Sequence, residues 1–225
     1  MDITEAARIV QQFCCQDLTS TLAAIEASAL GLTSNQCPAA LAACGARDDV
    51  LVAAGIVKKL AAQINVIIHA SGILMCLPKI LESDEFVQYL SLGAGNTGRP
   101  FDLETNKRIA EFKFIRWRGA DAIRQNNLFK DFYQLTEYST PKRKYVYVLG
   151  TEYPLKFLNE RRAIASVLDK HATLLEQFRA MHGNKYETVR DYYQARGTGV
   201  TIQDISLWVN GLAAEGVDEV EPAEI

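Results

Sequence analysis

One segment, RPFDLETNKRIAEFKFIRW at residues 99–117, places charged side chains inside what reads as a buried hairpin. Apolar and β-branched residues flank ETNKR on both sides, which indicates two antiparallel strands joined by a tight turn. With residues 106–107 as a two-residue loop, Asp102 lies directly opposite Glu111. Strand side chains alternate between faces, so Lys113 shares the face of Glu111. The hairpin therefore predicts a cluster of two carboxylates and one lysine.

Two carboxylates held side by side need a cation. Like charges directly opposite each other destabilise a sheet, and a divalent metal bound by oxygen ligands removes that repulsion. The alternative is a surface hairpin in which Glu111 and Lys113 form a simple ion pair. Phe112 and Phe114 alternate with these two residues and point to the opposite face, which favours a central strand with one face in a core.

The charge of the chain is unevenly distributed. The 225 residues, 48% hydrophobic and 23% charged, suffice for one globular domain with its own core. Residues 99–162 hold 14 basic and 8 acidic side chains, whereas residues 1–98 and 163–225 are both net acidic. Basic residues around a pair of carboxylates that could bind a metal ion favour a substrate that carries phosphate groups. The alternative is that the basic side chains cover solvated strand edges.

The sequence predicts a cytoplasmic protein. The N-terminus is acidic where a signal peptide would be basic, and the longest apolar run, INVIIHASGILMCL, has 14 residues. This run is too short to span a bilayer, so we expect a buried helix. No Cys-x-x-Cys occurs, so we interpret the cysteines as reduced core thiols, with a reactive Cys14–Cys15 pair as the alternative. The cysteines are Cys14, Cys15, Cys37, Cys44 and Cys76.

The apolar periodicity predicts an α/β fold in which helices precede and follow a sheet. The expected helices cover residues 3–30, 48–81 (ending near Pro78), 119–138, 160–183, 185–196 and 201–213. Besides the hairpin, the expected strands are 86–92 and 144–151. The prediction is a central mixed sheet of about four strands flanked by helices. Residues 93–98, literally G-x-G-x-x-G, precede a hairpin rather than a helix, so we expect a flexible loop instead of a dinucleotide site.

This layout, with Pro100-Phe101-Asp102, eight residues and Glu111-Phe112-Lys113, resembles the PD-(D/E)xK nuclease superfamily over about residues 60–160. The resemblance implies a restriction-endonuclease-like core in which Asp102, Glu111 and the backbone carbonyl of Phe112 bind Mg²⁺ or Mn²⁺. It also implies that Lys113 is the catalytic lysine. Metal-assisted hydrolysis of phosphodiester bonds requires this chemistry.

The resemblance implies a metal-dependent nuclease, with DNA rather than RNA as the expected substrate. Family members often carry another acid on the helix before the first strand, but here that helix offers only Gln63, Asn65 and His69. We expect His69 to be a hydrogen-bonded core residue. The missing acid keeps a second hypothesis open, a catalytically inactive protein that binds nucleic acid or serves assembly.

Seven residues are candidate substrate contacts, with solvated surface positions as the alternative for each. They are Arg99, Arg124, Gln125, Lys130, Lys142, Arg143 and Lys144. The predicted organisation is a helical N-terminal extension (1–60), a nuclease-like core (61–160), C-terminal helices packed on the core (161–214) and a disordered acidic tail (215–225). A homodimer is a candidate assembly, and no membrane partner is expected.

Overall fold

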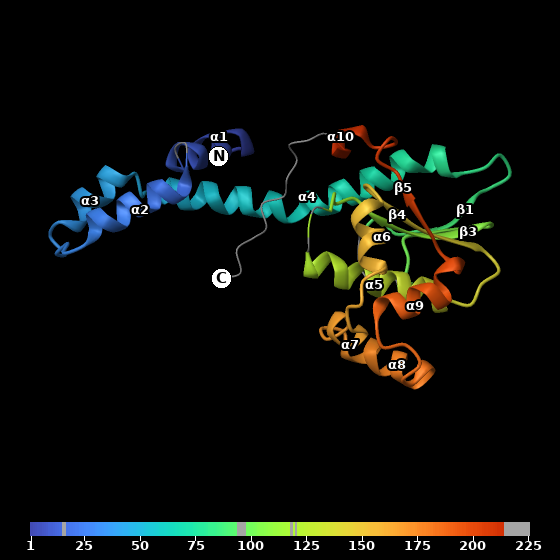
Figure 1. The fold of residues 1–225 in the computed structure, drawn as a ribbon. Coiled ribbons are helices and arrows are strands. Elements are labelled where there is room, and N and C mark those ends of the chain that lie inside the picture. Colours follow the sequence, from blue (N-terminus) through green and yellow to red (C-terminus); the bar gives the residue numbers. More distant parts are fainter. Residues whose placement is uncertain (15–16, 94–97, 118, 120, 214–225) are drawn as a thin grey trace. The chain divides into compact units, whose positions relative to one another are not determined.

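The computed structural model describes all residues except 15–16, 94–97, 118, 120 and 214–225, and leaves out the side chain of Leu41. The predicted acidic tail and Cys15 therefore lie outside the described residues. The chain divides into two compact units, Met1–Asn65 and Val66–Ile225. The long helix α4 contributes to both units (Figure 1).

The first unit is helical. It contains α1 (Ile3–Cys14), α2 (Leu18–Ala29), α3 (Cys37–Cys44) and the start of α4 (Asp48–Ile80). The helix expected over residues 3–30 is two helices, because the carboxylate of Asp17 caps α2 by accepting hydrogen bonds from the backbone N–H groups of Thr19 and Ser20. The small core of this unit centres on Ala6, Ile9 and Ala53.

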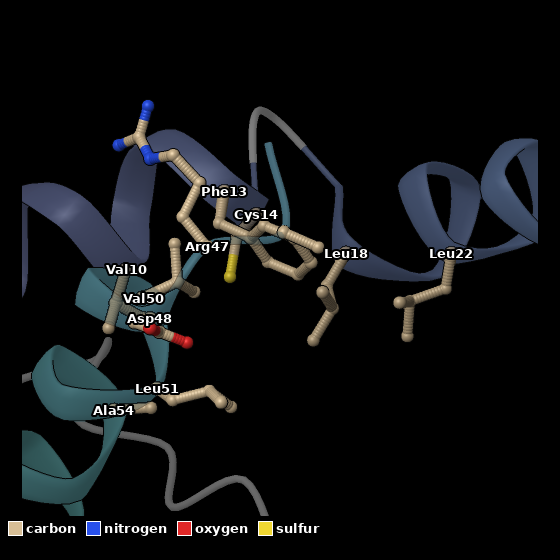
Figure 2. A pocket seen from close by; sticks show the side chains of 11 residues that line it. Val10, Phe13, Cys14, Leu18, Leu22, Arg47, Asp48, Val50, Leu51 and Ala54 are labelled. Carbon is tan, nitrogen blue, oxygen red and sulfur yellow. The ribbon is translucent and has the colours of Figure 1, made fainter. Parts of the chain in front are cut away.

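An apolar pocket of about 640 Å³ opens in the first unit (Figure 2). Its lining residues are Val10, Phe13, Cys14, Leu18, Leu22, Ala46, Arg47, Asp48, Val50, Leu51 and Ala54. The guanidinium of Arg47 is already bound to the carboxylate of Asp49, with 2.9 Å between Nη2 and Oδ2. The basic side chain that lines this pocket is therefore already paired with a neighbouring acid.

The second unit is an α/β fold. Its strands are β1 (Val87–Leu90), β2 (Leu103–Thr105), β3 (Arg108–Lys113), β4 (Arg143–Val148) and β5 (Thr201–Asp204). After the end of α4, its helices are α5 (Ala122–Glu137), α6 (Glu152–Leu158), α7 (Ile164–Val167), α8 (Ala172–His182), α9 (Val189–Arg196), the 3₁₀ turn η1 (Gly197–Gly199) and α10 (Asn210–Ala213).

The five strands form one open mixed sheet in the order β1-β2-β3-β4-β5. β1, β2 and β3 pair antiparallel, whereas β3, β4 and β5 pair parallel. Leu103 lies opposite Ala110 and Glu104 opposite Ile109, which confirms the hairpin register predicted from the two-residue loop. An open mixed α/β sheet is thus confirmed, with one strand more than expected.

The two faces of the sheet bury separate cores. On one face, Ala110, Phe112 and Phe114 pack with Ile73 and Cys76 from the end of α4. On the other face, the neighbouring residues of the same strands pack against α5. This second cluster includes Ile109, Val146, Val148, Leu128, Phe129 and Phe132. Figure 1 shows α4 and α5 on opposite sides of the strands. The predicted alternation along β3 is confirmed, because Phe112 and Phe114 are buried on one face.

The expectation of a buried helix at the longest apolar run is wrong for most of its length. α4 has 33 residues, and 17% of its most apolar 18-residue window, with a mean hydropathy of 1.8, is buried. By length and composition alone it could cross a membrane. Its last part packs instead on the sheet, where Ile73 and Cys76 are fully buried.

The interpretation of the cysteines as core thiols holds for Cys76 but is wrong for Cys37, which is exposed.

The C-terminal region differs most from expectation. The helix predicted over 201–213 is wrong at its start, because residues 201–204 form β5 beside β4, with Tyr145 opposite Thr201. The helix predicted over 160–183 is two helices, α7 and α8, and it begins late because Ala163 forms an isolated β-bridge with Thr188 that holds the chain extended before α7. Gly183, at φ 56°, ends α8 as expected.

Candidate active site

The candidate site lies where β2 begins and β3 ends. The backbone N–H of Asp102 donates to the carbonyl of Ala110 at 3.0 Å, although Ala110 already lies opposite Leu103, so the ladder is irregular just before β2. The strand pairing ends at Leu103 and Ala110, and the bond from Asp102 is one residue out of step with it, so the predicted pairing of Asp102 with Glu111 stays a prediction. Glu111 and Lys113 alternate with Phe112, so they lie on the face that packs against α5.

Both carboxylate oxygens of Asp102 have partners. Oδ2 accepts a hydrogen bond from the backbone N–H of Phe112 at 2.9 Å, and Oδ1 lies 3.2 Å from Nε2 of His69 on α4. The ring of His69 also meets Phe114 edge-on, with 5.8 Å between centroids. His69 is hydrogen-bonded, as expected, but it is only partly buried rather than a core residue, and its partner is a predicted metal ligand. Asp102 is therefore fixed by strand β3 and by α4, the helix on the face of the sheet opposite to α5.

Lys113 joins two carboxylates. Its Nζ donates to Oε1 of Glu111 at 2.7 Å and forms an ion pair with Oδ2 of Asp131, which projects from α5. The second oxygen of Asp131, Oδ1, lies 3.1 Å from Nζ of Lys130. The side chain of Asp131 is 6% exposed, so this carboxylate faces the cluster rather than solvent.

Burial and charge shift the pKa values in this cluster. Burial raises the pKa of Glu111 to about 8, with the negative charges of Asp131 and Asp102 adding to the rise and the ammonium of Lys113 opposing it. For Lys113, burial acts to lower the pKa, but the carboxylates of Asp131 and Glu111 outweigh it and raise the pKa. Lys113 is therefore held as an ammonium ion.

The backbone of Phe112 completes the arrangement. The N–H and C=O of one strand residue point toward the same neighbouring strand. Because its N–H donates to Asp102, the carbonyl of Phe112 is directed to the side of β3 on which Asp102 lies. Two carboxylates and a carbonyl are oxygen donors of the kind that Mg²⁺ uses, together with water and substrate phosphate. The donor set of the predicted site thus fits such an ion.

The three ligands are fewer than a closed protein cage would need. Within the described part of the chain, no group of three or more His, Cys, Asp and Glu side chains is arranged to hold a metal ion. An ion at this site would depend on substrate or solvent oxygens for its remaining positions, as is usual for Mg²⁺ at phosphate-processing sites.

Three of the candidate substrate contacts lie at the other end of the sheet. Arg143 pairs in register with Arg108, whereas Val148 pairs with Lys113. Five residues at about 3.3 Å each separate these positions by roughly 16 Å along the strands. The structure therefore does not bring Lys142, Arg143 and Lys144 together with the carboxylate cluster.

These three basic side chains already have partners. The Nζ of Lys142 lies 2.6 Å from Oε1 of Glu104, and Arg143 forms an ion pair with Glu82. Lys144 donates to the backbone carbonyl of Thr136 at 2.8 Å. Their contacts are thus ones that hold this end of the sheet together.

The four other candidates have different surroundings. Arg99 forms an ion pair with Glu104 and lies over the ring of Tyr89, and Arg124 lies 3.2 Å from the helix-capping carboxylate of Asp121. Gln125 accepts a hydrogen bond from Arg162. Lys130 contacts Asp131 and so belongs to the Lys113 cluster.

Sequence reasoning missed Asp131 as a site residue. The signal was present, because Arg124, Asn127 and Asp131 recur at helical spacing on the polar stripe of α5. What the pattern does not show is that Asp131 is buried against the end of β3.

The glycine-rich segment before the hairpin is described only at its ends. Gly93 and Gly98 have φ values of 88° and 75°, which favour glycine, and a Cβ at Gly93 would lie 3.3 Å from Val66. The residues between them lie outside the described part.

Comparison of the chain with known protein families, curated proteins and solved structures finds no match.

Proposed function

We propose that this protein is a metal-dependent nuclease of the PD-(D/E)xK type, which hydrolyses phosphodiester bonds in nucleic acid. The observation that carries the proposal is the hydrogen bond that ties Asp102 to β3 at Phe112, between Glu111 and Lys113. Asp102 is anchored to the backbone of β3 beside Glu111, and Lys113 follows on the face of Glu111. Two acids and a lysine at the end of a central strand match the chemistry of this reaction.

Asp102 and Glu111, with the carbonyl of Phe112, would hold the metal. When bound, Mg²⁺ or Mn²⁺ would supply Lewis-acid stabilisation of the phosphate and a lower pKa for an attacking water. His69 and the N–H of Phe112 keep the carboxylate of Asp102 in one orientation. Groups that do not bind the metal themselves would in this way orient a residue that does. Lys113, an ammonium ion here, would orient the nucleophile and offset negative charge in the transition state.

A second candidate, a nucleic-acid-binding or assembly module with the same fold but no turnover, is favoured by one observation. Glu111 is engaged by Lys113, and the helix before the first strand contributes His69 rather than an acid. If metal fails to displace that ion pair, the cluster serves only structure. For both candidates, DNA is the first ligand to test. We also propose that the protein is cytoplasmic.

A cleavage panel separates the two. Single- and double-stranded DNA and RNA are incubated with Mg²⁺ or Mn²⁺ at low salt, because phosphate contacts weaken steeply with salt. The nuclease proposal expects cleavage that Lys113→Ala reduces with little change in KM. Lys107→Ala is the matched control, since Lys107 lies in the same hairpin but pairs with Glu82 and Asp84. Binding without cleavage by the wild type would reject the nuclease and support the binding module.

A further inference from the structure

We infer that Asp131 is a positioning residue that retains Lys113 when a divalent cation takes Glu111. This inference rests on the proposed function, because it assigns a role to a residue on α5 in that same reaction. Its basis is the geometry of one lysine shared by two carboxylates on different elements.

Lys113 cannot keep both Glu111 and Asp131 as partners once a divalent cation occupies the site. Glu111 would have to turn its oxygens to the cation, and the ammonium of Lys113, which now donates to Oε1 of Glu111 at 2.7 Å, would then face a like charge. Asp131 is already in contact with the ammonium and comes from α5, outside the hairpin that carries the ligands. Glu111 can therefore turn from Lys113 to the cation with the loss of only one hydrogen bond, because Asp131 continues to hold the ammonium group.

The surroundings of Asp131 indicate a counter-ion rather than a third metal ligand. Its two oxygens each face an ammonium group, Lys113 at Oδ2 and Lys130 at Oδ1. Asp102 differs, because its oxygens face a backbone N–H and an imidazole. The two ammonium groups already balance the negative charge of Asp131. Within the described part of the chain, no ammonium group lies beside Asp102, so its carboxylate is the better ligand for a cation.

The exchange has a chemical consequence. An ammonium group has three donors, and breaking the bond to Glu111 releases one of them. With Asp131 holding the group in place, that donor can point at the attacking water or at a phosphate oxygen. Without Asp131, Lys113 would be free to swing toward solvent, since its side chain is 30% exposed.

The direct test is a crystal structure of the wild-type protein with Ca²⁺, which fills oxygen sites without needing turnover. We expect Ca²⁺ on Asp102 and Glu111, and Nζ of Lys113 within hydrogen-bond distance of Asp131 but not of Glu111. Asp131 oxygens on the cation, or Lys113 turned to solvent, would overturn the inference while leaving the nuclease proposal intact. A soaked crystal with no cation at the cluster would overturn both.

Kinetics provide the second test, on whichever nucleic acid the wild type cleaves. Asp131→Asn should lower kcat by about ten- to a hundredfold with little change in KM, the usual effect of losing an outer-shell partner. Asp131→Glu should restore most of the activity. Asn127→Ala, one turn earlier on α5 and exposed, is the matched control and should leave kcat unchanged.

A double-mutant cycle shows whether Asp131 acts through Lys113. In a Lys113→Ala background, Asp131→Asn should change the residual kcat by less than about twofold, because the group it positions is gone. An equal loss in both backgrounds would mean a merely structural role and would overturn the inference. A wild type that cleaves nothing would reject the proposed function itself, which is a separate outcome.

Discussion

A buried ion pair at the turn end of the hairpin gives the sharpest stability prediction. The guanidinium of Arg108 binds Glu85 through two hydrogen bonds of 2.6 Å, one to each carboxylate oxygen. Oε1 of Glu85 also accepts from the hydroxyl of Thr105, and Arg108 donates to the hydroxyl of Tyr147 at 3.2 Å. The side chain of Glu85 is fully buried, so Glu85→Ala leaves a buried guanidinium without its carboxylate.

The expected loss follows from this burial. Breaking a buried ion pair by removing one partner typically costs about 3–5 kcal/mol, because the remaining charge is uncompensated. Replacing both partners by apolar residues is often nearly neutral, so Glu85→Leu with Arg108→Met should recover much of the loss. Glu82→Ala is the matched control. Glu82 contacts the same guanidinium at 3.2 Å but is 42% exposed, and its removal should change stability little.

Urea unfolding followed by tryptophan fluorescence measures the effect in the right part of the chain. Both tryptophans, Trp117 and Trp208, lie in the unit Val66–Ile225. Glu85→Ala should lower the midpoint at an unchanged slope. A loss below about 1 kcal/mol, or a double variant as unstable as the single one, would refute the reasoning that burial makes this pair costly to break.

Two further predictions concern α4 and the carboxylate cluster. Gly72→Ala should destabilise by about 1–3 kcal/mol through overpacking, because a Cβ there would lie 2.5 Å from Phe114. Gly55→Ala, on the same helix but in the unit Met1–Asn65, meets no neighbour among the described residues and should gain up to about 1 kcal/mol. Urea midpoints measured by far-UV circular dichroism, which reports on the helices of both units, check the two variants, and equal effects would contradict the packing. The metal-free protein should lose stability as the pH rises from about 4.5 to about 8, because the raised pKa of Glu111 keeps a proton in the folded state that the unfolded chain releases. Glu111→Gln should flatten this slope in thermal melts, and an unchanged slope would show that Glu111 is ionised throughout.

The hairpin was predictable because its information is local. A two-residue loop and strict alternation fix which residues face each other, so the pairing of Leu103 with Ala110 follows from the sequence alone. The amphipathic helix α5 was predictable for a similar reason, since its apolar stripe has helical spacing.

Other features depend on partners distant in sequence. Residues 201–204 become a strand because β4 offers a free edge some 55 residues earlier, and tertiary pairing overrides a local helical pattern. The burial of Asp131 depends on where α5 packs on β3, which no local pattern encodes. The basic residues 142–144 are near the site in sequence, but the parallel register of β3 and β4 places them at the opposite end of the sheet.

Binding of Mn²⁺ tests the central claim most directly, because both the nuclease proposal and the role of Asp131 require a cation at the hairpin. Calorimetry on wild type, Asp102→Asn and the control Asp84→Asn compares the predicted ligand with an acid at the other end of the sheet, where Asp84 pairs with Lys107. The account predicts that wild type and Asp84→Asn bind Mn²⁺ alike and that Asp102→Asn does not bind. Wild-type protein that binds no Mn²⁺ at millimolar concentration, or Asp102→Asn that binds as wild type does, would contradict it.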